Sequence, residues 1–104
     1  MTNQAKKVVE RFRTAAVTLD EAVLKEIAEL TDINNHTEAS LLGAKALKAT
    51  KLVKKLELVL KLQDLEGHLP MGLSEYRTRL NKELMEAAKR ALSPEDYERF
   101  HGSY

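Results

Sequence analysis

The chain has no cysteine and no tryptophan, and it has little glycine, proline and aromatic residue. Without cysteine there is no disulfide framework, no thiolate metal site and no cysteine nucleophile. The 4 glycines are isolated from one another, so no glycine-rich phosphate loop exists. No apolar run approaches the roughly 18 residues that a membrane span requires. The missing cysteine fits a reducing compartment, and we expect a cytoplasmic location.

What is present is a helical composition. Of the 104 residues, 43% are hydrophobic and 32% are charged, and no segment alternates as a half-buried strand would. This length is typical of one domain, so residues 1–104 are predicted to form a single helical domain.

Helical periodicity predicts four helices, over residues 4–31, 38–66, 74–92 and 94–101. The apolar residues from Val8 to Leu30 keep one helical phase within an arc of about 140°, which favours a continuous first helix. Thr18 and Glu21 have the spacing of a capping box, so a bend near Thr18 stays open. Gly67 suits the end of the second helix, and Ser93 followed by Pro94 suits the start of the last. The fold class is therefore all-α: a long antiparallel helical hairpin, a third helix and a short C-terminal helix.

The second predicted helix is apolar over too wide an arc for the rest of the chain to cover. The third helix is shorter than the hairpin, and large uncovered apolar stripes usually mark interfaces. We therefore expect a homodimer with coiled-coil-like packing, in which Leu52, Leu56 and Val59 are the interface anchors. Lys45 and Gln63 lie in the same seam, where polar residues fix the register of packing.

A second set of apolar residues is predicted to pack the third helix against the second. These helix-packing residues are Leu58, Leu62 and Leu65 on the second helix and Tyr76, Leu80 and Leu84 on the third.

Charge is balanced overall, with 17 basic and 16 acidic residues, but it is segregated along the chain. Residues 18–40 carry six acids and one lysine, and residues 41–63 carry six lysines and one glutamate. Blocks of opposite sign are typical of adjacent antiparallel helices. The simplest interpretation is that the acidic and lysine-rich blocks lie side by side.

The candidates for chemistry are weak. Glu98 and His101 have the Glu-x-x-His spacing of carboxylate-bridged metal bundles, but the other ligands of such a site are missing. The 4 serines are mostly explained as helix caps or tail. We expect no catalytic residues, no metal site and no cofactor, and a protein that is not an enzyme.

Two functions remain. The first is a non-enzymatic protein-interaction module, such as a self-associating adaptor, regulator, inhibitor or assembly factor with a protein partner. The alternative is a nucleic-acid-associated protein that binds a polyanion through Lys48, Lys51, Lys54 and Lys55, which follow one another on one side of the second helix. The absence of an aromatic platform beside these lysines disfavours this alternative.

Overall fold

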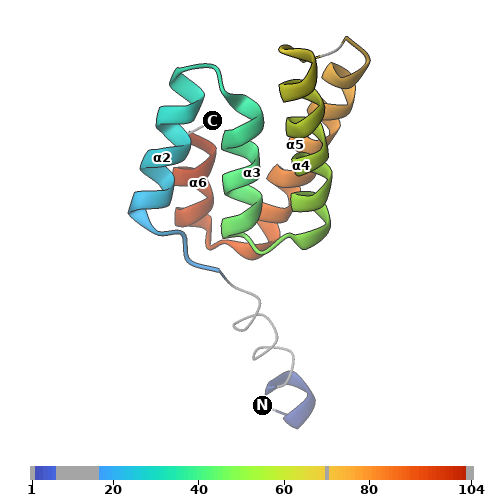
Figure 1. Ribbon diagram of the computed structural model, residues 1–104. Helices are drawn as coiled ribbons and strands as arrows, with labels where there is room; N and C mark the ends of the chain where they lie inside the picture. The colour runs from blue at the N-terminus through green and yellow to red at the C-terminus, as the bar shows by residue number, and fades with distance from the viewer. Residues whose placement is uncertain (1, 7–16, 70, 103–104) are drawn as a thin grey trace.

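The computed structural model describes residues 2–6, 17–69 and 71–102 of the chain. Every regular element that it describes there is helical, which confirms the all-α class. Figure 1 shows a front row of helices with further helices behind it. The row consists of α2 (Glu21–Asp32), α3 (His36–Ala46) and α4 (Thr50–Glu66), and behind it are α5 (Met71–Ala91) and α6 (Pro94–Gly102).

The central helix is α3, which packs against α2, α4 and α5. It buries small residues on several sides, among them Ala39, Ser40, Gly43 and Ala44. Small side chains let neighbouring helix axes approach closely. Because α3 stands between α2 and α4, the acids of α2 and the lysines of α4, which make up most of the two blocks, are not neighbours. The interpretation that these two blocks pair with each other is therefore wrong.

The predicted continuous helix over residues 4–31 is also wrong, because residues 17–20 are not helical. Asp20 caps α2, and its carboxylate accepts a hydrogen bond of 3.1 Å from the backbone N–H of Ala22. The backbone N–H of Val17 donates to the carbonyl of Ala91, at 2.8 Å, and ties this segment to the end of α5. A side-chain cap of this kind stabilises a helix start by about 1 kcal/mol. Residues 7–16 lie outside the described part.

The predicted helix over residues 38–66 is two helices, because the helical conformation is interrupted between Ala46 and Thr50. Lys48 adopts a left-handed conformation with φ 59°. The sequence signal for this break is Leu47, which would lie on the lysine side of a continuous helix but is buried in the structure. Burying a leucine contributes about 1.5–3 kcal/mol. This outweighs the roughly 1–2 kcal/mol that a left-handed residue costs.

The other predicted helix ends agree more closely with the structure. The turn between α2 and α3 falls at Asn34, whose φ of 59° suits asparagine. Gly67 ends α4 with φ 75°. At the start of α6, the Ser93 hydroxyl accepts a hydrogen bond of 3.2 Å from the Asp96 N–H. The third helix begins at Met71 rather than Ser74, and the Ser74 hydroxyl donates to the Met71 carbonyl instead of capping a helix.

Candidate interaction face

The three predicted interface anchors, Leu52, Leu56 and Val59, lie in the core of their own chain. Leu56 and Val59 are completely buried, and Leu52 is 5% exposed. All three belong to the same cluster as Leu80 and Leu84 of α5. A side chain covered by its own fold has no surface left for a second copy. The prediction that these residues anchor a dimer is therefore corrected: they are the inner face of α4.

The polar residues predicted for that seam have different environments. Gln63 is half-buried, and its side-chain oxygen accepts a hydrogen bond of 3.0 Å from the hydroxyl of Thr37, which is itself 1% exposed. This bond joins the start of α3 to the last turns of α4. Lys45 is exposed on α3 and does not lie in a seam with Gln63. Gln63 thus contributes to packing within the chain.

The predicted helix-packing set is divided between the core and the surface. Leu80 and Leu84 are completely buried, which confirms them, and Tyr76 is half-buried. On α4, by contrast, two of the three predicted packing leucines lie at the surface: Leu58 is 54% exposed and Leu65 is 74% exposed. Leu62 is half-buried. Leu58 and Leu65 do not pack against α5, so this part of the prediction is wrong.

The exposed leucines share one side of α4 with lysines. Positions 51, 54, 58, 61 and 65 fall within an arc of about 80° at 100° per residue. Each of these residues is exposed. We call this surface the outer face of α4; it consists of Lys51, Lys54, Leu58, Lys61 and Leu65.

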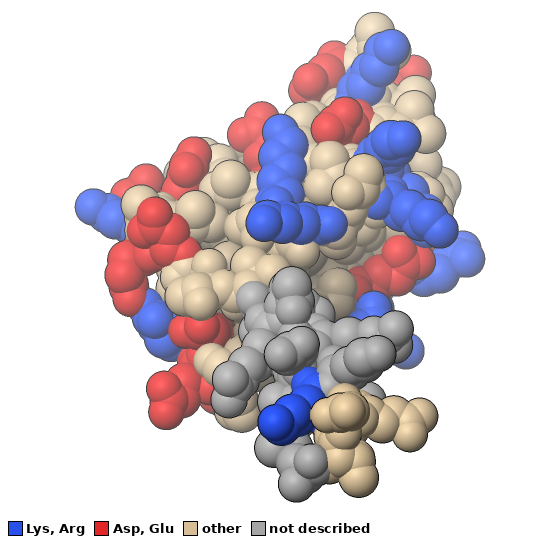
Figure 2. Space-filling view, turned by 90° about the horizontal axis from the view of Figure 1, so that it is seen from below, with Lys and Arg blue, Asp and Glu red and all other residues tan. Residues whose placement is uncertain are grey.

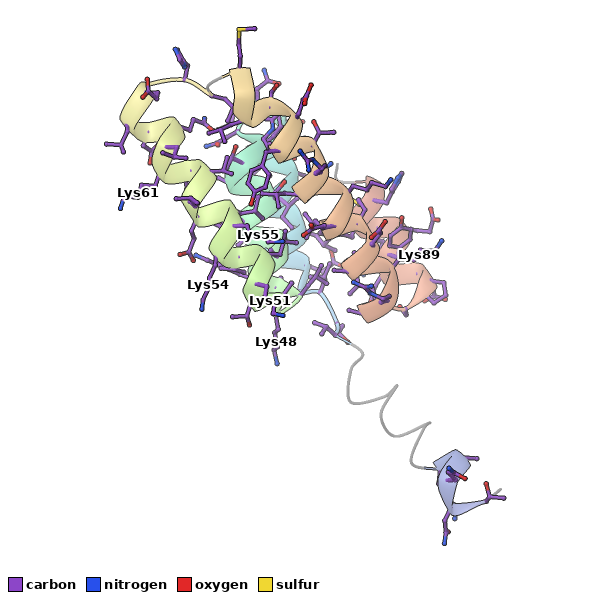
Figure 3. The ribbon with its side chains drawn as sticks, turned by 90° about the vertical axis from the view of Figure 1, so that its right-hand side faces the viewer. Lys48, Lys51, Lys54, Lys55, Lys61 and Lys89 are labelled. Atoms are coloured by element: carbon purple, nitrogen blue, oxygen red, sulfur yellow. The ribbon has the colours of Figure 1, made fainter. Side chains whose placement is uncertain are left out.

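The lysines on and beside this surface do not all point the same way. Figure 3 shows Lys54 and Lys61 projecting from the side of α4 away from α5, and Lys55 pointing toward α5. Lys48 precedes α4, and Lys51 lies at its first turn, where it lines a groove with Lys55 and Glu83. The Lys55 ammonium lies 3.4 Å from a carboxylate oxygen of Glu83 on α5. Among the described residues, no acid lies within ion-pair distance of the other four lysines. Four of these five positive charges therefore face solvent without a partner in the described part of the chain.

The opposite charge collects at the other end of the row of helices. The exposed residues of α2 include Glu21, Glu26, Glu29 and Asp32, with Lys25 among them. Figure 2 shows acidic residues gathered on the side of α2 and basic residues gathered on the side of α4 and α5. The segregation of charge along the sequence becomes a segregation across the molecule, and it leaves the α4 side basic.

The described residues add no support for a metal site at Glu98 and His101 or for a membrane-spanning helix. Glu98 and His101 are both exposed on α6. In the part that the structure describes, no three side chains of histidine, aspartate or glutamate cluster as a metal site would require. Likewise, none of the described helices combines the length and the apolar content of a membrane span.

Comparison with protein-family models, with curated proteins and with solved structures finds no match to this chain. The outer face of α4 therefore offers the strongest indication of function, although its leucines were predicted to pack against the third helix. The signal that locates it is the spacing of seven residues between Leu58 and Leu65. This spacing sets both leucines on the lysine side of α4, about 120° and 140° away from Leu52 at 100° per residue.

Proposed function

We propose that this protein is a non-enzymatic protein-interaction module whose outer α4 face binds an acidic amphipathic helix of a partner protein. The observation that carries the proposal is the alternation of exposed leucines with unpaired lysines on one side of one helix. A helix lying along this face would cover the leucines and place carboxylates beside the lysines, which is the helix-in-groove mode of recognition.

The leucines argue for a protein partner. Leu58 and Leu65 are two of the four large hydrophobic residues that are most exposed in the described part of the chain. Covering a leucine side chain contributes about 1.5–3 kcal/mol. A phosphate backbone would gain nothing from these two side chains. A partner with its own apolar side chains would gain affinity at both positions.

The lysines indicate that the partner's contacting surface is negatively charged. Lys51, Lys54 and Lys61 flank the leucines and have no acid within ion-pair distance among the described residues. Charge complementarity of this kind accelerates association and selects the partner more than it adds affinity. Acidic residues at helical spacing on the partner are therefore expected beside its apolar residues.

The length of the face sets the size of the partner segment. The outer face spans from Lys51 to Lys61 and on to Leu65, or about 21 Å at 1.5 Å per residue. A partner helix of about 15 residues would cover it completely. Such a contact is small, so we expect a reversible complex rather than a permanent one.

The test uses a synthetic helical peptide with leucine and glutamate on one face, measured by fluorescence anisotropy against the full chain. Replacing Leu58 and Leu65 together by serine is expected to weaken binding by at least about tenfold. Lys54→Glu with Lys61→Glu should weaken binding and reduce its salt dependence. The matched control is Lys25→Glu with Lys82→Glu, on exposed positions of α2 and α5, which should leave binding unchanged.

Two other outcomes would contradict the proposal. Light scattering that shows a dimer dissociated by Leu58→Ser and Leu65→Ser would identify the occupant as a second copy, which is the homodimer expected from the sequence. Binding of duplex DNA that depends on Lys48, Lys51 and Lys54 but not on the leucines would favour the nucleic-acid alternative. A cytoplasmic location stays a prediction, supported by the absence of cysteine.

A further inference from the structure

A polar pocket lies between the first turns of α3 and the middle of α5. Its volume is about 170 Å³, and its lining is His36, Ser40, Arg77, Thr78 and Asn81. A buried water needs only about 10–15 Å³ of such space, so the pocket has room for a group of several non-hydrogen atoms. The outer face of α4 contributes no residue to this lining. The pocket is thus separate from the surface that carries the proposed function.

One buried atom in this pocket lacks a partner. The side-chain oxygen Oδ1 of Asn81 is buried and accepts no hydrogen bond. It is the single orphaned side-chain atom of this kind among the described residues. Buried polar atoms are nearly always paired, because leaving water without a new partner costs free energy. An acceptor without a donor at the wall of a polar pocket points to a ligand that carries an N–H or O–H group.

The second group of interest is Arg77, which is half-buried in the same lining. Within the described part of the chain, its guanidinium has no ion pair and no hydrogen bond. No acidic side chain of the described residues lines the pocket to neutralise it. The planar guanidinium fits a carboxylate through two parallel hydrogen bonds. His36 and Ser40 add further possible donors from α3.

We propose that this pocket binds a carboxylate whose α-carbon bears an N–H or O–H group. Arg77 holds the carboxylate, and Oδ1 of Asn81 accepts the α-donor. Two sources supply this chemistry, the C-terminal end of a polypeptide and a free α-hydroxy acid. A small fragment of either kind satisfies both unpaired groups at once.

The test is a titration of the 15N-labelled full chain followed by NMR. The probes are N-acetylglycine for a polypeptide end, lactate for an α-hydroxy acid, and propionate as the matched carboxylate without an α-donor. N-acetylglycine or lactate should shift the amide signals of His36, Ser40, Arg77 and Asn81 and bind about tenfold more tightly than propionate, because a buried acceptor is satisfied. The tighter of the two identifies the source.

Variants separate binding from folding. Arg77→Lys should weaken both preferred probes by about tenfold, since a lysine loses the two parallel bonds. Arg79→Lys, on an exposed position two residues away, should not. Asn81→Leu should make lactate bind as weakly as propionate, and the dispersion of the NMR spectrum shows that each variant is folded.

The proposal is overturned by any of three results. One is the absence of shifts in these four residues at tens of millimolar of every probe. Another is equal affinity for lactate and propionate, which would show that Oδ1 of Asn81 receives no donor. The last is tighter binding of inorganic phosphate than of either preferred probe, which would make the pocket a general anion site.

Discussion

The two faces of α4 contain the same residue type in opposite environments. On the inner face, Leu56 is completely buried between α3 and α5, whereas on the outer face Leu65 is 74% exposed. Both residues belong to one helix of 17 residues, and the sequence pattern predicted both to be covered. The leucine content of a helix therefore indicates that one of its faces is buried, but not which one. Which leucines are buried depends on where the neighbouring helices lie.

The difference between the two faces is tested most directly by shortening one leucine on each. Leu56→Ala removes buried methyl groups and leaves a cavity, so we expect the free energy of unfolding to fall by about 2–5 kcal/mol. Leu58→Ala, two residues away on the outer face, should change it by less than about 1 kcal/mol. Urea unfolding followed by circular dichroism measures both. Equal losses would show that Leu58 is covered in solution.

The hydrogen bond between Thr37 and Gln63 tests the polar edge of the inner face. Thr37→Val removes the donor from a site that is 1% exposed and leaves the Gln63 oxygen unpaired. We expect a loss of about 1–3 kcal/mol in the free energy of unfolding. Gln63→Leu in the same chain should recover part of that loss, because no acceptor is then left unpaired. A double-mutant cycle measures the coupling, and no coupling would contradict the bond.

Gly67 at the end of α4 and Gly72 in the first turn of α5 have the same open surroundings but different backbone conformations. An added Cβ would meet nothing within 4 Å at Gly67 or at Gly72. Gly67 has φ 75°, so Gly67→Ala is expected to destabilise by about 1 kcal/mol. Gly72 is helical within α5, and Gly72→Ala should stabilise by up to about 1 kcal/mol. Thermal unfolding should show opposite shifts, and shifts of equal sign would contradict the assigned conformations.

The smallest expected effect lies between the two faces, at the pair of Lys55 and Glu83. Their side chains are 45% and 49% exposed, and solvent screens the interaction. We expect Lys55→Ala to cost no more than about 0.5–1 kcal/mol, and less at high salt. Unfolding at two salt concentrations measures this difference. A loss as large as that of Leu56→Ala would mean that Lys55 packs as part of the inner face.

Helix periodicity predicted the all-α class and the buried leucines Leu80 and Leu84, and local sequence signals predicted a turn between residues 31 and 38 and the helix start at Ser93. These features depend on local chemistry: an asparagine that tolerates φ above zero, a hydroxyl that accepts an N–H bond, and side chains spaced on one face. The break before α2 was left open as a bend near Thr18, because the apolar phase continues through it. The break at Lys48 was missed, because no glycine or proline marks it.

The candidate site was predicted only in part. The lysines on one side of α4 were identified from sequence, and the structure confirms that they are exposed. Leu58 and Leu65 were assigned to packing, because a helix that is apolar on two sides must be covered on both, and α5 was taken as the second cover. The pocket that joins His36 and Arg77 could not be predicted, since these residues are distant in sequence and neither carries a motif.

Sequence alone predicted the helical character of the chain, several helix ends and the separation of charge into blocks, because periodicity, capping and side-chain chemistry act over a few residues. The tertiary structure decided which apolar side chains are buried and which charges stay unpaired. These outcomes follow from the interruption of the helix at Lys48. There Leu47 packs into the core, and α3 becomes a separate helix between α2 and α4. That placement buries the inner face of α4 and leaves its outer face, with two leucines and three lysines, in solvent.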